Sequence, residues 1–163
     1  MHRGGTASGS SLSFVFARQL LVLLLSTSAS MATPSFNGIG DLSGGAIGSG
    51  AFGMSGNGLT AVGYGSSSSG MEAARWTSTG GIVGIGDLPG GFFNSWAEDA
   101  SYDGSVIVGK AHSASGSEAF RWTAADGLTI LPGYIPGYGL APARAASADG
   151  TAVAPVPRST SRF

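Results

Sequence analysis

The stretch SGSEAFRWT, residues 115–123, occurs almost unchanged as SGMEAARWT at residues 69–77, which is 46 positions earlier. The same shift superimposes GIGDLSGG, residues 38–45, on GIGDLPGG, residues 84–91, without a gap. Motifs that keep their order and spacing at one fixed period are typical of tandem structural repeats. The sequence therefore predicts that a unit of 46 residues is duplicated.

A third copy begins on schedule but is incomplete. The tetrapeptide SADG at residues 147–150 lies one period after SYDG at residues 101–104, yet no third RWT follows. The missing motif suggests a truncated or frameshifted chain. The expected segments are a signal peptide at 1–32, a first repeat at 36–81, a second repeat at 82–127, and an incomplete, degenerate third repeat at 128–163.

Each period contains four short apolar runs separated by turn residues. Between the first two runs of the second repeat lies Asp103-Gly104, a dipeptide favoured in two-residue type I′ hairpin turns. Pro and Gly residues connect one period to the next. Each repeat is therefore predicted to be a four-stranded antiparallel meander, with strands in the second repeat at 96–101, 105–109, 118–123 and 128–131.

The predicted fold class is all-β, with β-propeller-like blades as the first choice. A period of about 40 to 50 residues with four strands is typical of a propeller blade, whereas the rungs of a β-solenoid, the alternative, are usually shorter. A closed propeller has about 4 to 8 blades, so the chain holds only part of one. We therefore expect a partial array, assembly with other chains, or an open stack that self-associates through exposed blade edges.

Composition and charge limit the classes of partner. Only 10% of the residues are charged, Gly contributes 29 residues, and the net charge is −1. No basic stripe exists to neutralise nucleic-acid phosphates or to attract an anionic membrane. The expected partner is an extracellular ligand or surface component that the sequence does not identify.

The N-terminus has the order of a secretory signal peptide. Arg3 and Arg18 precede the apolar run LLVLLL, and small residues follow up to a cleavage site after Ala32. The run is too short to span a membrane, which needs about 20 apolar residues. We expect the protein to be secreted or bound at the cell surface; an uncleaved N-terminal anchor and a spurious N-terminal extension are the alternatives.

The chain has no cysteine. It therefore lacks the disulfides on which small exported domains often depend. Thiol catalysis and cysteine-ligated metal sites are excluded as well. Stability must come from packing between repeated units or against partner chains.

Recurrent residues are interpreted as structural. A catalytic group is needed once, whereas a turn cap, a packing residue or an ion pair between blades is needed in every repeat. The tryptophans recur at one register, which favours packing between blades over a platform for sugar rings. The positions interpreted in this way are Trp76, Trp122, Arg75, Arg121, Glu72, Glu118, Asp41, Asp87, Asp103 and Gly104.

The residues outside the repeat pattern give no catalytic, cofactor or metal prediction. Glu98 and Asp99 are the only adjacent pair of acids, but successive strand residues point to opposite faces. His2 falls in the signal segment and His112 in a turn, so no second imidazole is left for a histidine zinc site. The Gly-rich segments lack the order of a phosphate-binding loop.

Three spaced motifs resemble the HAF-type repeats of bacterial extracellular proteins. They are EAFRWT, GIGDLPGG and the pattern A-x-S-x-DG-x-x-VG, and the similarity covers residues 36–150. Glu72 and Glu118 stand where the family has its histidine, and Ala74 stands where it has phenylalanine. The resemblance implies an exported or surface-associated repeat protein from a family of largely uncharacterised function.

The sequence is compatible with three functions. The first is a binding or structural module without enzymatic activity. The second is a hydrolase or lyase of extracellular polysaccharide that uses Glu98 and Asp99 beside Trp96 or Tyr102. The third is a truncated product that has lost its function.

Overall fold

The described part of the chain is built of strands. The computed structural model describes residues 38–132 and 143–155, and within them it contains strands and turns but no helix, which confirms the all-β prediction. Among these residues, accordingly, none belongs to a helix that could cross a membrane. The predicted signal peptide lies outside the described residues.

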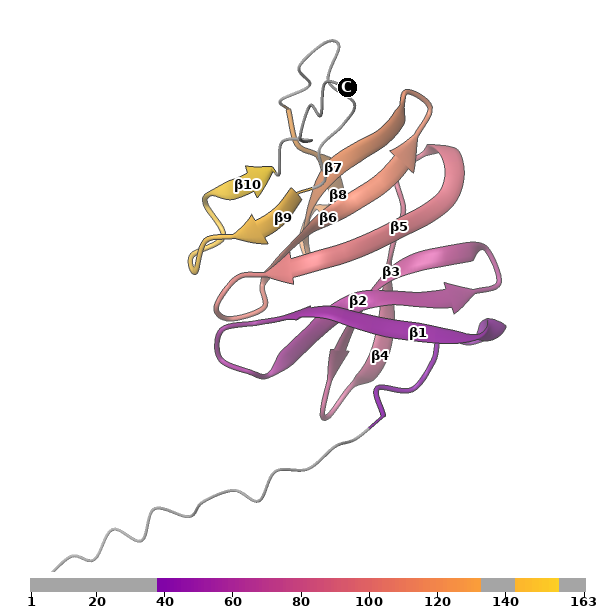
Figure 1. The fold of residues 1–163 in the computed structure, drawn as a ribbon, viewed down its shortest axis with the longest axis horizontal. Helices are drawn as coiled ribbons and strands as arrows, with labels where there is room; N and C mark the ends of the chain where they lie inside the picture. The colour runs from indigo at the N-terminus through magenta and orange to yellow at the C-terminus, as the bar shows by residue number, and fades with distance from the viewer. Residues whose placement is uncertain (1–37, 133–142, 156–163) are drawn as a thin grey trace, which may run out of the picture. The chain divides into compact units, whose positions relative to one another are not determined.

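Ten strands follow one another along the chain (Figure 1). Unit 1 contains β1 (Gly44–Met54), β2 (Thr60–Ser67), β3 (Gly70–Thr77) and β4 (Gly81–Gly86). Unit 2 contains β5 (Gly90–Ala100), β6 (Val106–Ser113), β7 (Gly116–Thr123) and β8 (Gly127–Ile130). Unit 3 contains β9 (Ala143–Ala146) and β10 (Val153–Pro155).

The strand bounds repeat with the period of the sequence. β5, β6 and β7 each start and end 46 residues after β1, β2 and β3. The predicted boundary after residue 81 coincides with the start of β4, so units counted by strands begin at Gly44 and Gly90 instead. The choice of starting point differs, but the period is the same.

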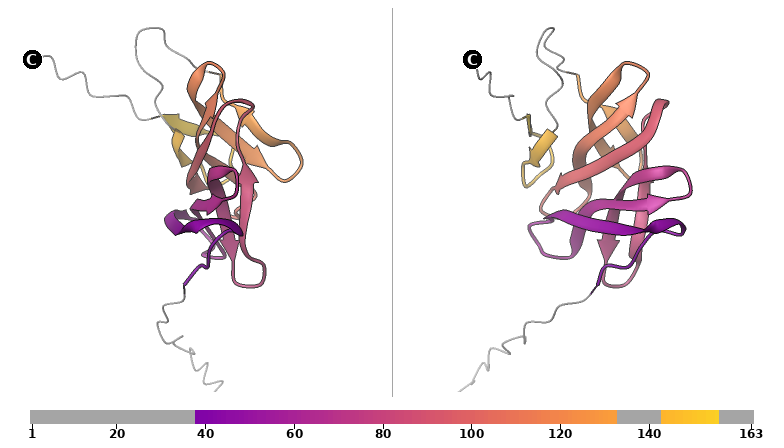
Figure 2. Two further views of the ribbon diagram at one scale, coloured as in Figure 1. Left: turned by 90° about the vertical axis from the view of Figure 1, so that its right-hand side faces the viewer. Right: turned by 45° about the vertical axis from the view of Figure 1, so that its right-hand side comes forward.

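Within each of the first two units, successive strands pair antiparallel, as a meander requires. The units are joined by a feature that the sequence did not indicate, a parallel pairing of Met71 in β3 with Asn94 in β5. This link makes one mixed eight-stranded sheet out of the two meanders, while β9 and β10 form a separate two-stranded sheet. β5 lies against β1, β2 and β3, and β9 lies against β5 and β6 (Figure 2).

The first strand of each unit is longer and less regular than predicted. In β5 the pairing register shifts between Gly90 and Ser95 and again between Ala97 and Asp99, and β1 repeats both shifts. The second shift leaves Glu98 outside the regular pairing, so simple alternation does not apply there. Alternation along the strand therefore gives no ground for placing Glu98 and Asp99 on opposite faces.

The hairpin turn is also longer than predicted. In unit 2 the N–H of Ser101 donates to the oxygen of Val106 at 2.9 Å, which leaves four residues in the loop instead of two. The N–H of Gly104 donates to the oxygen of Ser101 at 3.0 Å, and Gly104 has a φ of 74°. These contacts define a β-turn over 101–104 that ends in a left-handed glycine. The type I′ prediction was wrong because Ser101 closes a wider loop.

The hydrophobic core lies between units. One cluster joins Val62 and Ala73 of unit 1 to Ala97, Ile107 and Phe120 of unit 2. A second cluster joins valines of β6 to Ala143 of unit 3. Each described unit thus buries at least one face against a neighbour, and unit 2 buries two, as expected where a single repeat is too thin to enclose a core.

Candidate functional site

The two recurrent tryptophans have different surroundings. Trp122 is partly buried against the cluster between units 1 and 2, and the Cζ atom of Arg75 in unit 1 lies 5.5 Å from its ring centroid. A cation over an aromatic face is attracted by the ring quadrupole. Trp122 therefore contacts the preceding unit. Its counterpart Trp76 lines a shallow depression on unit 1.

The recurrent glutamates and arginines do not pair with each other within the described residues. Glu72 and Arg75, like Glu118 and Arg121, are three positions apart on a strand, which places them on opposite faces. Arg121 lies instead 4.0 Å from the carboxylate of Asp126 in its own unit.

Glu72 also binds within its own unit. Its Oε1 accepts a hydrogen bond from the N–H of Gly86 at 3.0 Å. Within the described ranges, no basic side chain forms a salt bridge with Glu72. Glu72 and Arg121 thus make their contacts inside their own units, whereas Arg75 reaches Trp122 of unit 2 through its cation and not through an ion pair.

Asp41 and Asp87 hold the irregular start of β1 and β5. Asp41 accepts hydrogen bonds from the N–H of Leu42 at 2.9 Å and of Gly48 at 2.8 Å. Asp87 makes the equivalent bonds to Leu88 and Asn94. Both oxygens of each carboxylate are thus engaged by backbone, which is the behaviour of a structural cap.

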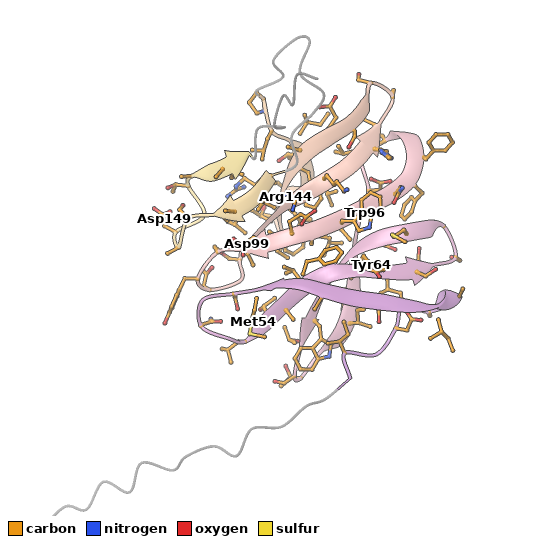
Figure 3. The ribbon with its side chains drawn as sticks, viewed as in Figure 1. Met54, Tyr64, Trp96, Asp99, Arg144 and Asp149 are labelled. Atoms are coloured by element: carbon orange, nitrogen blue, oxygen red, sulfur yellow. The ribbon has the colours of Figure 1, made fainter. Side chains whose placement is uncertain are left out.

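Asp103 organises the hairpin turn of unit 2. Its Oδ1 accepts from the Ser101 hydroxyl at 2.7 Å and from the Ser105 N–H at 2.9 Å. Asn57 and Asp149 make the same bonds at the corresponding positions of units 1 and 3, and Figure 3 shows Asp149 at the tip of the β9–β10 hairpin. One loop geometry is therefore used three times.

These hydrogen bonds stabilise the ionised carboxylates. The backbone N–H of Ser105, followed by the hydroxyls of Ser105 and Ser101, lowers the pKa of Asp103 from 3.8 to about 2. The Ser147 hydroxyl is the largest cause of the same lowering of the pKa of Asp149, again to about 2. Hydrogen bonds to the charged form of an acid favour that form.

The lowered pKa values predict acid sensitivity. A depressed folded-state pKa contributes stability above the unfolded pKa, and that contribution is lost as the pH falls from about 4 to about 2. The double variant Asp103→Asn/Asp149→Asn should keep the turns, because Asn57 makes the same bonds, but lose this part of the pH dependence. Urea midpoints measured across this window test the expectation. Equal acid sensitivity of both proteins would contradict it.

The three turns also bind each other through their backbones. The N–H of Asn57 donates to the oxygen of Tyr102 at 2.9 Å, and the N–H of Tyr102 donates to the oxygen of Ala148 at 2.9 Å. A Cβ atom added to Gly104 would lie 2.6 Å from Oγ1 of Thr60, so the turn of unit 2 fits closely against unit 1. Asp103 and Gly104 thus lie in a row of stacked turns.

Sequence reasoning missed Ser95. Its side chain is fully buried, and its hydroxyl accepts from the N–H of Ala73 at 2.9 Å and donates to the oxygen of Gly86 at 2.7 Å. One hydroxyl thus links the first strand of unit 2 to two strands of unit 1. The recurrence of serine at Ser49, one period earlier, is the sequence pattern that indicates this structural role.

Three of the residues considered for polysaccharide chemistry, Trp96, Asp99 and Tyr102, have different surroundings. Oδ2 of Asp99 accepts from the N–H of Ala146 in unit 3 at 3.0 Å. Nζ of Lys110 lies 4.2 Å from the ring centroid of Trp96, and the ring of His112 meets the Trp96 ring edge-on at 6.2 Å. Tyr102 is exposed in the hairpin turn.

The depression on unit 1 is small. It is lined in part by Ala51, Ala61, Ala74 and Trp76, and its volume is about 10 Å³. This is close to the space of one water molecule and far below the several hundred Å³ of a typical ligand pocket. Among the residues that the structure describes, no three histidine or acidic side chains gather as a metal site would require.

Comparison with known proteins gives no match to a protein family, to a curated protein or to a solved structure.

Proposed function

We propose that the chain is an exported binding or structural module of the HAF type, without enzymatic activity, whose units stack as β-propeller-like blades. The observation that carries the proposal is that equivalent residues are buried at two successive interfaces between units. Ala97 and Ala143 are equivalent residues, and each is almost completely buried against the preceding unit. Stacking of this kind is what extended repeat scaffolds use to present a surface.

The polar residues support a scaffold role. The side chains of Asp87, Ser95 and Asp103 all form hydrogen bonds with backbone atoms or with neighbouring hydroxyls. A catalytic acid needs a carboxylate within reach of substrate and a perturbed environment in a cleft. The engaged carboxylates of the repeat are therefore assigned to folding and not to chemistry.

The proposed ligand-binding surface is the irregular start of β5 and its counterpart in β1. Phe92 is 85% exposed and Ile47 is fully exposed, although both are large apolar side chains. Exposed aromatic side chains are frequent at surfaces that bind partners. The proposed partner is an extracellular polymer or surface component in contact with these tips.

A glycan array probed with the full chain tests this surface. We expect binding that the variant Phe92→Ser weakens at least about tenfold, as removal of a central aromatic contact does. The matched control Tyr102→Ser removes an exposed aromatic residue in the distant hairpin turn and should bind as the parent does. Equal binding by all three proteins would contradict the assignment of the surface.

The alternative is a hydrolase or lyase of extracellular polysaccharide. The observation in its favour is the register shift at Glu98, because bulges redirect side chains beside active sites. Turnover of a polysaccharide that Glu98→Gln abolishes would establish this alternative and refute the pure binding module. A chain that neither binds nor turns over any substrate would instead support the reading of a truncated product without function.

A further inference from the structure

Unit 1 exposes the face that the following units bury. We call the side of a unit that contacts the preceding unit its leading face, and the opposite side its trailing face. At equivalent positions of the leading face, Ala97 in unit 2 is 0% exposed and Ala143 in unit 3 is 1% exposed, whereas Ala51 in unit 1 is exposed. The difference arises because no described unit precedes unit 1.

Larger apolar side chains are exposed on the same face. Met54 is 60% exposed, whereas its equivalent Ala100 is 6% exposed in the interface between units 1 and 2. Figure 3 shows Met54 on β1, on the side away from β5. A thioether side chain adapts its shape readily to a partner surface. The leading face of unit 1 is thus an apolar surface without a partner among the described residues.

Ser49, on the leading face of unit 1, makes one of the two hydrogen bonds that its equivalent Ser95 makes in unit 2. The hydroxyl of Ser49 donates to the oxygen of Gly40 at 2.6 Å, as Ser95 does to Gly86. Ser95 also accepts from the N–H of Ala73, a strand residue of the preceding unit. No described residue makes the corresponding bond to Ser49.

The hairpin turn of unit 1 has room for a neighbouring turn. A Cβ atom added to Gly104 or Gly150 would meet the side chain of Thr60 or Val106 in the preceding unit. At the equivalent Gly58, no atom lies within 4 Å of an added Cβ atom. The backbone is the same, since the φ angles are 72°, 74° and 68°.

Unit 3 exposes the complementary face. Ala152, just before β10, and Ala154, on β10, are exposed, whereas their equivalents in unit 2, Val106 and Val108, are buried beneath unit 3. The stack of described units therefore has a different open half-interface at each end. One belongs to the leading face of unit 1, and the other belongs to the trailing face of unit 3.

We propose that a second copy of this chain docks head to tail, with the trailing face of its unit 3 on the leading face of unit 1. The contact continues the interface that already joins units 1 and 2 and units 2 and 3. Because the two surfaces differ, the association is heterologous and leads to a closed ring or to a chain of copies. The inference rests on the stacking in the proposed function but not on any ligand.

Charge placed on either open face tests the proposal by sedimentation velocity at increasing concentrations of the full chain. The parent should form dimers and larger species. Ala51→Arg on the leading face and Ala154→Arg on the trailing face should each remain monomeric, because a buried unpaired charge opposes association. The matched control Thr79→Arg adds the same charge to the exposed β3–β4 turn and should associate as the parent does.

An equimolar mixture of Ala51→Arg and Ala154→Arg gives the sharpest result. Ala51→Arg has an unchanged trailing face, and Ala154→Arg has an unchanged leading face. The mixture should therefore form a 1:1 dimer and no larger species. A monomeric parent, an Ala51→Arg variant that associates as the parent does, or a mixture without dimer would each overturn the proposal. Association of Ala51→Arg would point to another surface, including residues 1–37. A chain that associates as expected but binds no ligand would contradict the proposed function and not the association.

Discussion

The variant Gly109→Ala is expected to lose about 3 kcal/mol of unfolding free energy, since overpacking against a rigid backbone is costly. A Cβ atom added to Gly109 would collide with the backbone oxygen of Trp96 and lie 3.0 Å from Cα of Ala97. Both atoms belong to β5 beside its register shift, where the strand cannot move without breaking its pairing. Urea denaturation followed by circular dichroism measures the loss.

A second glycine provides the control for this variant. At Gly48 an added Cβ atom finds nothing closer than 4.0 Å, and the backbone does not have a positive φ angle. Gly48→Ala should therefore be neutral or stabilise the fold by up to about 1 kcal/mol through the unfolded chain. An equal loss of unfolding free energy in both variants would show that the close approach of the β5 backbone is not the reason for a glycine at position 109.

The variant Phe120→Ala is expected to lose about 3 to 5 kcal/mol of unfolding free energy, the usual range for a buried phenylalanine. Phe120 is the largest fully buried side chain among the described residues, and it lies in the cluster between units 1 and 2. Its removal takes apolar contacts from both units and leaves a cavity. Thermal and urea unfolding measure the loss.

Phe92→Ala is the matched control, since it removes the same side chain from an 85% exposed position of the same unit. Its unfolding free energy should change by less than about 0.5 kcal/mol. Similar losses for both variants would place the stabilising contacts outside the interface between units. Unit 1 has Ala74 at the position of Phe120, and the shallow depression there shows what the smaller residue leaves unfilled.

The sequence predicted the features that depend on local pattern. Alternating apolar residues in EAFRWT and the turn residues of SYDG were sufficient to place four strands per period. The fixed spacing of Trp76 and Trp122 was sufficient to reveal the duplication. These features depend on patterns along the chain and not on contacts between strands, and the first two units each contain the four strands.

Features that depend on contacts between strands could not be predicted in the same way. The parallel pairing of Met71 with Asn94 and the register shift at Glu98 are set by how β5 packs on unit 1. The loop at Asp103 is wider than its dipeptide suggests because the Ser101 hydroxyl takes the N–H of Val106 at 3.1 Å. A spacing of three along a strand, in contrast, is a local feature, and it is sufficient to exclude a direct pair of Glu72 with Arg75.

The row of turns joined by Asn57, Tyr102 and Ala148 gives the molecule an additive stability. In such a one-dimensional array, the free energy grows with the number of contacts between neighbours and not with the number of units alone. Among the three described units, unit 2 alone has both of its faces covered by neighbours. Unfolding is therefore expected to start at the two ends of the array, and each further unit joined to an end would protect the unit that was previously outermost.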